Sequence, residues 1–363
     1  MKAIALIARI IVGVLFIFSG LIKVNDPVGT AIKLEEYFEV FSTDISSFFL
    51  IFIPYALILS VFLSVLEVVL GLAILLWYRS RATIWTLLLM IIFFTFLTFY
   101  SAYFNKVTDC GCFGDAIKLT PWQSFIKDII LLVLILVLFF NMNTFRAVLP
   151  KRMGNIVVGA CSVIGVAVAI YAIQYLPFID FRAYKIGTNI PISMQPSEPL
   201  QYRYIMSKDG KEHTFDSYPT EDGYEYVAME LVNPEAQAKI TDYNLWSNEG
   251  DFTDESFRGN KLFVVIHNAN TASTKNLQAI NALVSELGDS VEPWALTASD
   301  EASFEAFRHE HQLAMPYFYG DATVLKTMIR TNPGLILMQD GVVKGKWSHN
   351  AVPEADEIRT ILY

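Results

Sequence analysis

Long apolar runs dominate the first half of this chain, at about residues 4–22, 49–77, 83–104, 124–143 and 156–177. A helix needs roughly 20 mostly apolar residues to cross a bilayer, so these runs predict a membrane α-helical bundle of four to five transmembrane helices. Pro54 lies near the start of the second run and favours a tilted or interfacial beginning there. Because no small-residue cleavage site precedes Lys23, we expect the first run to be a retained anchor and not a signal peptide.

The charge pattern changes at about residue 180. Residues 1–180 hold 12 Lys and Arg against 10 Asp and Glu, whereas residues 181–363 hold 15 against 26, a net charge of −11. Phosphate contacts need clustered basic side chains, so this acidic half is not expected to bind nucleic acid. We therefore expect a transmembrane domain over 1–180, in contact with membrane lipid, and a water-soluble portion after it.

Basic residues fall in two loops and indicate the orientation. They are Arg79 and Arg81 between the second and third runs, and Arg146, Lys151 and Arg152 between the fourth and fifth. The loop at 24–47 is instead acidic. The positive-inside rule places the basic loops in the cytoplasm, so the 24–47 loop, the cysteine-bearing loop and everything after the fifth run are expected on the opposite face.

Charged residues also lie inside or at the ends of the apolar runs: Arg9, Lys23, Glu67 and Asp128. Charges in a bilayer are costly and usually face the bundle interior, where they pair. One interpretation is a polar pocket or proton route formed by Arg9, Glu67 and Asp128. The other is an Arg9 that reaches the cytoplasmic interface and an Asp128 that is wetted at the outer surface.

Three cysteines are present, two of them in Cys110-Gly111-Cys112 and the third, Cys161, in an apolar run. Two thiols separated by one glycine close a strained disulfide ring, and strain favours an oxidising bond. A structural turn disulfide and a pair of metal ligands are the alternatives. No metal is expected, because no His and no third Cys lies nearby and zinc sites usually supply four ligands. Cys161 is expected to be a packing residue.

The polar positions resemble a known family. The motifs that carry this resemblance are Arg9-x-x-x-Gly13, Phe18-Ser19-Gly20-x-x-Lys23, Glu67-x-x-x-Gly71, and Asp109-Cys110-Gly111-Cys112-Phe113-Gly114-Asp115 followed by Trp122 and Asp128. Over about residues 4–145 the chain is similar to the DoxX superfamily, and to its MauE-like branch in particular. The resemblance implies redox work at the periplasmic face of a bacterial inner membrane, with quinone as electron acceptor. It also implies catalytic roles for Cys110, Cys112, Glu67 and Asp128, and cofactor binding by Arg9, Lys23 and Trp122.

The second half divides into a Pro-containing linker and hairpin region at 181–239 and an alternating α/β pattern at 240–363. The hairpin joins Tyr202–Met206 to His213–Phe215. Strands are predicted at Lys261–His267 and Trp294–Thr297, a helix at Thr274–Leu287, a helix after Ser299, and a terminal hairpin from Leu335 to Trp347.

This pattern resembles a thioredoxin-like domain, with Asn332-Pro333-Gly334 at the place of the family's cis-proline. Where that family carries Cys-x-x-Cys, this chain reads His267-Asn268-Ala269-Asn270-Thr271-Ala272-Ser273. Without sulfur the domain cannot exchange disulfides, so we expect it to bind a periplasmic or envelope partner. His267 is expected to be a hydrogen-bonded structural residue.

Two functions remain open from the sequence. One is a membrane thiol:quinone oxidoreductase that uses Cys110 and Cys112. The other is a non-catalytic scaffold or accessory subunit of a cell-envelope complex.

Overall fold

The computed structural model of the 363-residue chain describes residues 2–107 and 111–363. Internal contacts divide the chain into two compact units, Met1–Arg182 and Ala183–Tyr363. We refer to them as the helical unit and the C-terminal unit.

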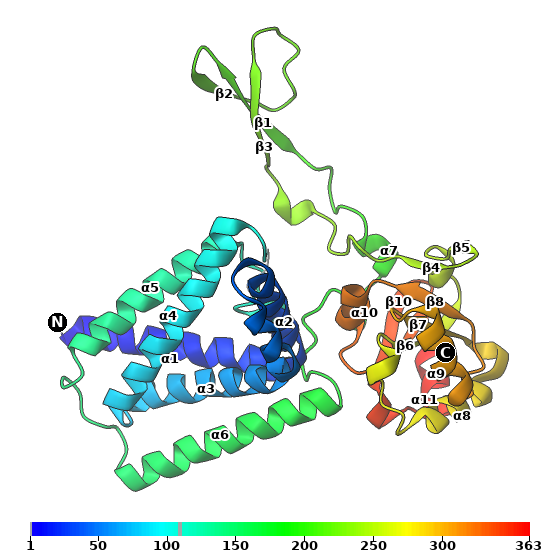
Figure 1. Ribbon diagram of the computed structural model, residues 1–363, viewed down its shortest axis with the longest axis horizontal. Coiled ribbons are helices and arrows are strands. Elements are labelled where there is room, and N and C mark those ends of the chain that lie inside the picture. Colours follow the sequence, from blue (N-terminus) through cyan, green and yellow to red (C-terminus); the bar gives the residue numbers. More distant parts are fainter. Residues whose placement is uncertain (1, 108–110) are drawn as a thin grey trace. The chain divides into compact units, whose positions relative to one another are not determined.

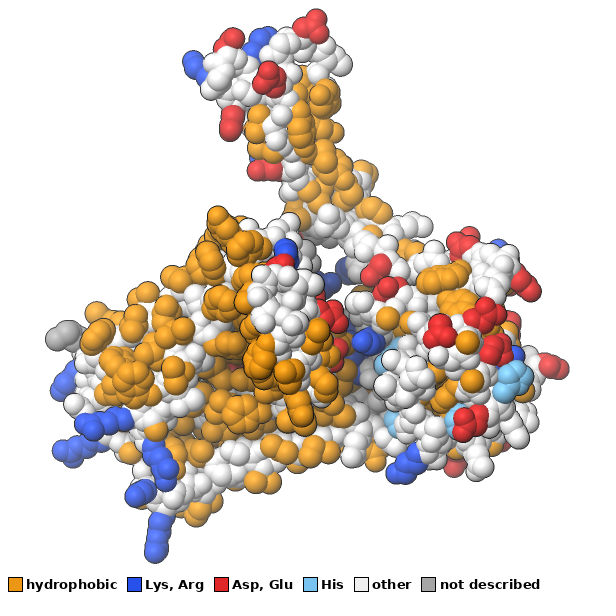
Figure 2. Space-filling model, in the orientation of Figure 1, with side chains coloured by type: hydrophobic (Ala, Val, Ile, Leu, Met, Phe, Trp, Pro, Cys, Tyr) orange, Lys and Arg blue, Asp and Glu red, His pale blue; other side chains and the backbone are white. Residues whose placement is uncertain are grey.

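The helical unit contains five apolar helical segments long enough to cross a membrane, counted over the described residues. They are α1 (Lys2–Asn25), a 3₁₀ segment with α3 (Ser47–Tyr55 and Ala56–Leu76), α4 (Ser80–Phe104), α5 (Pro121–Phe140) and α6 (Lys151–Gln174). Many large apolar side chains on their outer faces are exposed, as Figure 2 shows in orange. Length, composition and this apolar surface identify a membrane protein, as the sequence predicted.

The 24–47 region is a helix and not the loop that the sequence predicted. Helix α2 spans Pro27–Asp44; Asp26 caps its amino end by accepting a hydrogen bond from the backbone of Gly29, and Pro27 occupies its first turn. Its buried residues recur at helical spacing and include Ala31, Leu34, Tyr37 and Phe41. The acidic residues of this segment hid an amphipathic pattern that buries one face of the helix.

Glycines allow α1 and α3 to cross at very short distance (Figure 1). A Cβ atom added to Gly71 would lie 2.7 Å from the carbonyl oxygen of Gly13, and one added to Gly20 would lie 2.8 Å from the backbone nitrogen of Val68. Small residues let helix backbones approach this closely in membranes. The crossing brings the polar residues of α1 and α3 to one place.

The C-terminal unit is built on a seven-stranded mixed sheet in the order β10-β9-β6-β7-β8-β4-β5. Strands β6, β7 and β8 are parallel, β9 pairs antiparallel with β6, and β10 pairs antiparallel with β9. The strands are β4 (Leu245–Ser247), β5 (Gly250–Asp251), β6 (Asn260–Ile266), β7 (Glu292–Thr297), β8 (Tyr317–Gly320), β9 (Gly334–Gln339) and β10 (Val342–Ser348). The helices are α8 (Leu277–Leu287), α9 (Glu301–Glu310), α10 (Ala322–Met328) and α11 (Ala355–Leu362).

The predicted strands and helices of residues 240–363 are present, and β8, α10 and α11 add to them. The peptide bond between Asn332 and Pro333 is cis, immediately before β9. A strand-rich domain therefore follows the helices, while its narrower assignment as thioredoxin-like stays a prediction.

The region at 183–239 is more structured than a linker. It holds the short helix α7 (Ile190–Ser193) and a three-stranded antiparallel sheet in the order β2-β1-β3. The predicted hairpin corresponds to β1 (Tyr202–Lys208) and β2 (Lys211–Phe215), and β3 (Glu225–Leu231) pairs with the other side of β1. Most side chains of β3 are exposed, which explains why no buried-strand pattern indicated it.

Candidate functional site

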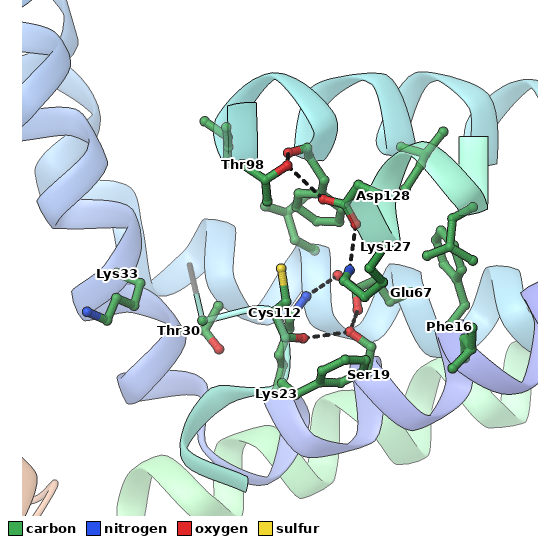
Figure 3. Close-up of a pocket in the computed structure, with 18 of the residues that line it drawn as sticks. Phe16, Ser19, Lys23, Thr30, Lys33, Glu67, Thr98, Cys112, Lys127 and Asp128 are labelled. Atoms are coloured by element: carbon green, nitrogen blue, oxygen red, sulfur yellow. Dashed lines mark hydrogen bonds and ion pairs between the residues drawn. The ribbon is translucent and has the colours of Figure 1, made fainter. Parts of the chain in front are cut away.

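A pocket of about 70 Å³ lies inside the helical unit, with residues of α1, α2, α3, α4, α5 and the segment 111–113 around it. This space has room for several water molecules, since one needs about 10–15 Å³. Most of its wall is apolar, including Phe16, Leu63, Ile91, Phe94 and Leu131. Six polar residues, Ser19, Lys23, Glu67, Thr98, Lys127 and Asp128, lie close together, whereas Thr30 and Lys33 lie apart from them (Figure 3).

Glu67 is the first buried charge of this pocket, with 2% of its surface exposed. Its Oε1 accepts a hydrogen bond from Lys23 Nζ at 2.5 Å, and its Oε2 lies 2.8 Å from the hydroxyl oxygen of Ser19. Lys23 Nζ also lies 4.8 Å from the centre of the Phe94 ring. Ser19 and Lys23 flank Gly20, so the close crossing of α1 and α3 is what places them beside Glu67.

Asp128 is the second buried carboxylate, with 1% of its surface exposed. It accepts hydrogen bonds from Lys127 Nζ at 2.5 Å and from the Thr98 hydroxyl at 3.0 Å. Helix α5 starts with a capping box between Thr120 and Gln123, which fixes Asp128 about two turns inside the helix. Asp128 is therefore buried and paired, and the interpretation of a wetted surface residue is wrong.

Cys112 lines the same pocket and is disulfide-bonded. Its carbonyl oxygen lies 2.9 Å from the Ser19 hydroxyl. The next residue, Phe113, packs its ring 5.7 Å from that of Phe18 and 5.5 Å from Lys127 Nζ. Cys110, the other predicted redox residue, lies outside the described residues. The disulfide-bonded Cys112 and the two carboxylates thus share one pocket.

The segment that leads into the cysteines is anchored to α2. Lys106 Nζ donates to both carboxylate oxygens of Asp44, at 2.5 and 2.6 Å, and the Tyr100 hydroxyl donates to the same carboxylate. The hydrogen bond from Lys106, followed by that from Tyr100, lowers the pKa of Asp44. The Ser101 hydroxyl donates to the carbonyl of Val107. These contacts fix where the loop leaves α4.

Arg9 is not part of the pocket, contrary to the interpretation that grouped it with Glu67 and Asp128. Its guanidinium donates to the carbonyl oxygens of Ile74, at 3.0 Å, and of Leu75, at the end of α3. The orphan carbonyls of a helix end are natural partners for a cation. Its guanidinium also lies over the rings of Trp77 and Phe145. Arg9 therefore joins α1 to the far end of α3.

Trp122 also lies away from the lining of the pocket. It is on the first turn of α5, is 52% exposed, and contacts Phe125 edge to face at 6.0 Å. Of the three predicted cofactor-binding residues, Lys23 alone is in the lining.

Sequence reasoning did not single out Ser19, Thr98 or Lys127 as site residues. Ser19 lies between Phe18 and Gly20 in the motif that carried the family resemblance, and that position was a usable signal. Thr98 gives no signal, because a threonine in an apolar helix commonly bonds its own backbone, as Thr98 also does to Phe94.

His267 lies at the end of β6 in the C-terminal unit. Burial, followed by repulsion from Lys326, lowers its pKa to about 4, so the imidazole is neutral at pH 7. Among the described residues its Nδ1 has no hydrogen-bond partner. Asn332 joins the neighbouring segment by donating to the carbonyl of Asn268 at 2.7 Å. The segment that follows β6 is therefore packed against the turn that holds the cis peptide bond of Pro333.

Fold and site together define a class: a helical membrane protein with a buried acid–base pocket beside a disulfide, followed by an α/β unit. Comparison with known proteins agrees with the membrane part of this description. Residues 1–141 match the family model described as Methylamine utilisation protein MauE. The chain is also 31% identical over 160 residues to Protein TlpB of Flavobacterium psychrophilum. That match covers 41% of this chain and 41% of the relative, so less than half of the relative's length is spanned.

Proposed function

We propose that the helical unit is a thiol–disulfide redox protein whose reactive pair is Cys110 and Cys112. The observation that carries the proposal is the position of the disulfide-bonded Cys112 in one pocket with two buried carboxylates, each paired with a lysine. Buried titratable groups in a cavity are costly for stability and are typical of functional sites. The match of residues 1–141 to the MauE family supports the same interpretation.

The chemistry is an exchange of two electrons. A substrate thiolate attacks one sulfur of the Cys110–Cys112 disulfide; that S–S bond breaks and a mixed disulfide forms. The second thiolate of the substrate then attacks the substrate sulfur of the mixed disulfide, and the bond from that sulfur to the protein cysteine breaks. The substrate leaves as a disulfide, and Cys110 and Cys112 are left as two thiols that have taken up two protons. Re-oxidation removes two electrons and two protons from them.

Glu67 and Asp128 are suited to hold and pass the protons, because both are buried next to the loop. The apolar walls and the ammonium groups of Lys23 and Lys127 fit a quinone, whose ring needs an apolar slot and whose carbonyl oxygens accept hydrogen bonds. A bound quinone would supply an acceptor for two electrons and two protons.

The proposed orientation follows from charge. Figure 2 shows Lys and Arg gathered at the end of the helical unit that holds the amino terminus. Arg79, Arg81, Lys151 and Arg152 lie at this end, where α3 and α5 finish and α4 and α6 begin. With this end in the cytoplasm of a bacterium, the cysteine loop and the chain beyond α6 face the periplasm.

For the C-terminal unit we propose a thioredoxin-like domain that binds a partner and performs no redox chemistry. It contains no cysteine, so electrons that enter through sulfur enter at the loop of the helical unit. The cis peptide bond at Pro333 and the parallel strands β6 and β7 support the proposed domain type.

A second candidate function, a scaffold subunit of an envelope complex, is favoured by the sheet β2-β1-β3. The exposed apolar side chains of β3 include Tyr226, Val227 and Met229. Exposed apolar groups gathered in one place often mark a protein interface. This candidate predicts a stable partner and no turnover.

The test uses the full chain in lipid nanodiscs, with reduced dithiothreitol as the dithiol and decylubiquinone as the acceptor. We expect quinone reduction by the native protein and its loss in Cys110→Ser and Cys112→Ser. Cys161→Ser is the matched control and should keep full activity, because Cys161 is a free thiol on α6. Activity that survives the double replacement of Cys110 and Cys112 would refute the redox proposal.

A further inference from the structure

Ser19 offers one hydrogen to two acceptors. Its hydroxyl oxygen lies 2.8 Å from Glu67 Oε2 and 2.9 Å from the carbonyl oxygen of Cys112 (Figure 3). A serine hydroxyl carries a single hydrogen. It can therefore make one full hydrogen bond as donor, and the two acceptors compete for it.

The protonation state of Glu67 decides this competition. An ionised carboxylate only accepts hydrogen bonds, and bonds to a charged acceptor are roughly twice as strong as neutral ones. With Glu67 ionised, the Ser19 hydrogen goes to Oε2. With Glu67 protonated on Oε2, the carboxyl group donates to Ser19, and Ser19 donates to the Cys112 carbonyl. All three groups are then satisfied in one chain of hydrogen bonds.

We propose that Ser19 is a positioning residue that couples the protonation of Glu67 to the redox state of the Cys110–Cys112 pair. This inference rests on the proposed function, because it requires the pair to cycle. Protonated Glu67 holds the Cys112 carbonyl in the position it has in the disulfide form. Reduction of the disulfide by a dithiol gives two thiols on the protein, gives the dithiol's own disulfide, and releases the proton from Glu67.

Other charged and titratable groups surround Glu67 and are part of the coupling. Lys23 is fixed on Oε1, which leaves Oε2 for Ser19. The remaining titratable groups that line the pocket are Lys33 and Tyr37 on α2, and Lys127 and Asp128 on α5. Helix α4 supplies Thr98, and Cys161 of α6 packs with Val65 and Val68 of α3. Lys127 neutralises Asp128 and Lys33 is bonded to Glu36, while Ser19 joins Glu67 to the carbonyl oxygen of Cys112.

The experiment measures the equilibrium constant between the full-length protein and dithiothreitol at several pH values between about 5 and 8, where folded proteins are most stable. Both partners are dithiols that take up two protons on reduction, so without coupling this constant does not depend on pH. The redox state of Cys110 and Cys112 is read by differential alkylation and mass spectrometry.

For the native protein we expect the equilibrium ratio of disulfide to dithiol form to rise roughly two- to tenfold as pH falls across this range, the factor typical of one hydrogen bond. Ser19→Ala should abolish this pH dependence, and Ser19→Thr should restore it. The Gln side chain in Glu67→Gln is neutral at every pH and can donate to Ser19. The equilibrium constant of this variant should therefore not depend on pH and should equal that of the native protein at low pH.

Ser60→Ala is the matched control. The Ser60 hydroxyl is fully buried and donates to the Pro27 carbonyl at 2.6 Å, away from the pocket, so its loss should leave the pH profile intact. A Ser19→Ala protein with the native pH dependence, or a flat native profile in a pair that exchanges normally, overturns the coupling alone. A native pair that does not exchange with dithiothreitol at any ratio overturns the proposed function as well.

Discussion

Replacement of Lys23 by Met tests whether the buried pair with Glu67 organises the helical unit. The side chains of Lys23 and Glu67 are 9% and 2% exposed, and their charged atoms are 2.5 Å apart. Removal of one partner of a buried pair leaves a buried uncompensated charge and costs about 3–5 kcal/mol. For a unit of this size, about 2–4 °C is lost per kcal/mol, so the midpoint of thermal unfolding should fall by roughly 6–20 °C.

Cys161 provides a readout confined to the helical unit. It is a free thiol in α6, packed with Val65, Val68 and Ala169, and the C-terminal unit has no cysteine. A thiol-reactive fluorogenic dye should therefore report the exposure of α6 on heating, as long as the disulfide of Cys112 is intact.

Two further variants make the result interpretable. Lys33→Met is the control, because Lys33 and its partner Glu36 are 30% and 37% exposed and such a pair contributes about 0–1 kcal/mol. The double variant Lys23→Met with Glu67→Gln removes both charges and should recover most of the loss. A Lys23→Met protein as stable as Lys33→Met, or a double variant no better than the single one, would refute the argument.

Three more outcomes follow from the structure. Gly71→Leu should lower the unfolding midpoint of the helical unit in the same dye assay by several degrees, since its Cβ would meet the backbone of α1 at 2.7 Å; Gly159→Leu, with nothing within 4 Å, should not. The hydrogen bond from Lys106 lowers the pKa of Asp44 below 3.8. The pair therefore stabilises the folded helical unit at neutral pH, and this stabilisation is lost as pH falls through the lowered pKa. Asp44→Asn should remove that acid dependence of the midpoint. Burial lowers the pKa of His267 from 6.5 to about 4. The free energy of opening of β6, measured by hydrogen exchange, should therefore fall by up to about 3 kcal/mol as pH drops from 6.5 towards 4. His267→Asn should abolish this fall.

The membrane segments could be predicted because a long apolar run has few other outcomes. The failure at α2 has a specific cause. Its charges, among them Glu35, Glu36 and Glu39, suggested a solvated loop, whereas Ala31 and Leu34 recur at helical spacing on the opposite side. Attention to period and not to charge would have found the helix.

The pairing of charges could not be predicted. The sequence shows that Arg9, Lys23 and Glu67 are costly in a bilayer, but depth and distance along the chain do not say which helix faces which. The contact of Gly20 and Gly71 with the neighbouring helix decides that Lys23 meets Glu67 and that Arg9 meets the end of α3. That choice depends on packing between helices, which a single sequence does not display.

The charge balance of the pocket bears directly on the proposed chemistry. Two ammonium groups, of Lys23 and Lys127, face two carboxylates, of Glu67 and Asp128, so the pocket is neutral when both carboxylates are ionised. Electrons delivered alone would leave thiolates in an apolar cavity, and an uncompensated buried charge is strongly disfavoured. Reduction of the disulfide is therefore favourable only when protons arrive with the electrons. Under the proposed function, the ion pairs select hydrogen transfer over electron transfer, and loss of any one of the four charges should slow the exchange more than it weakens substrate binding.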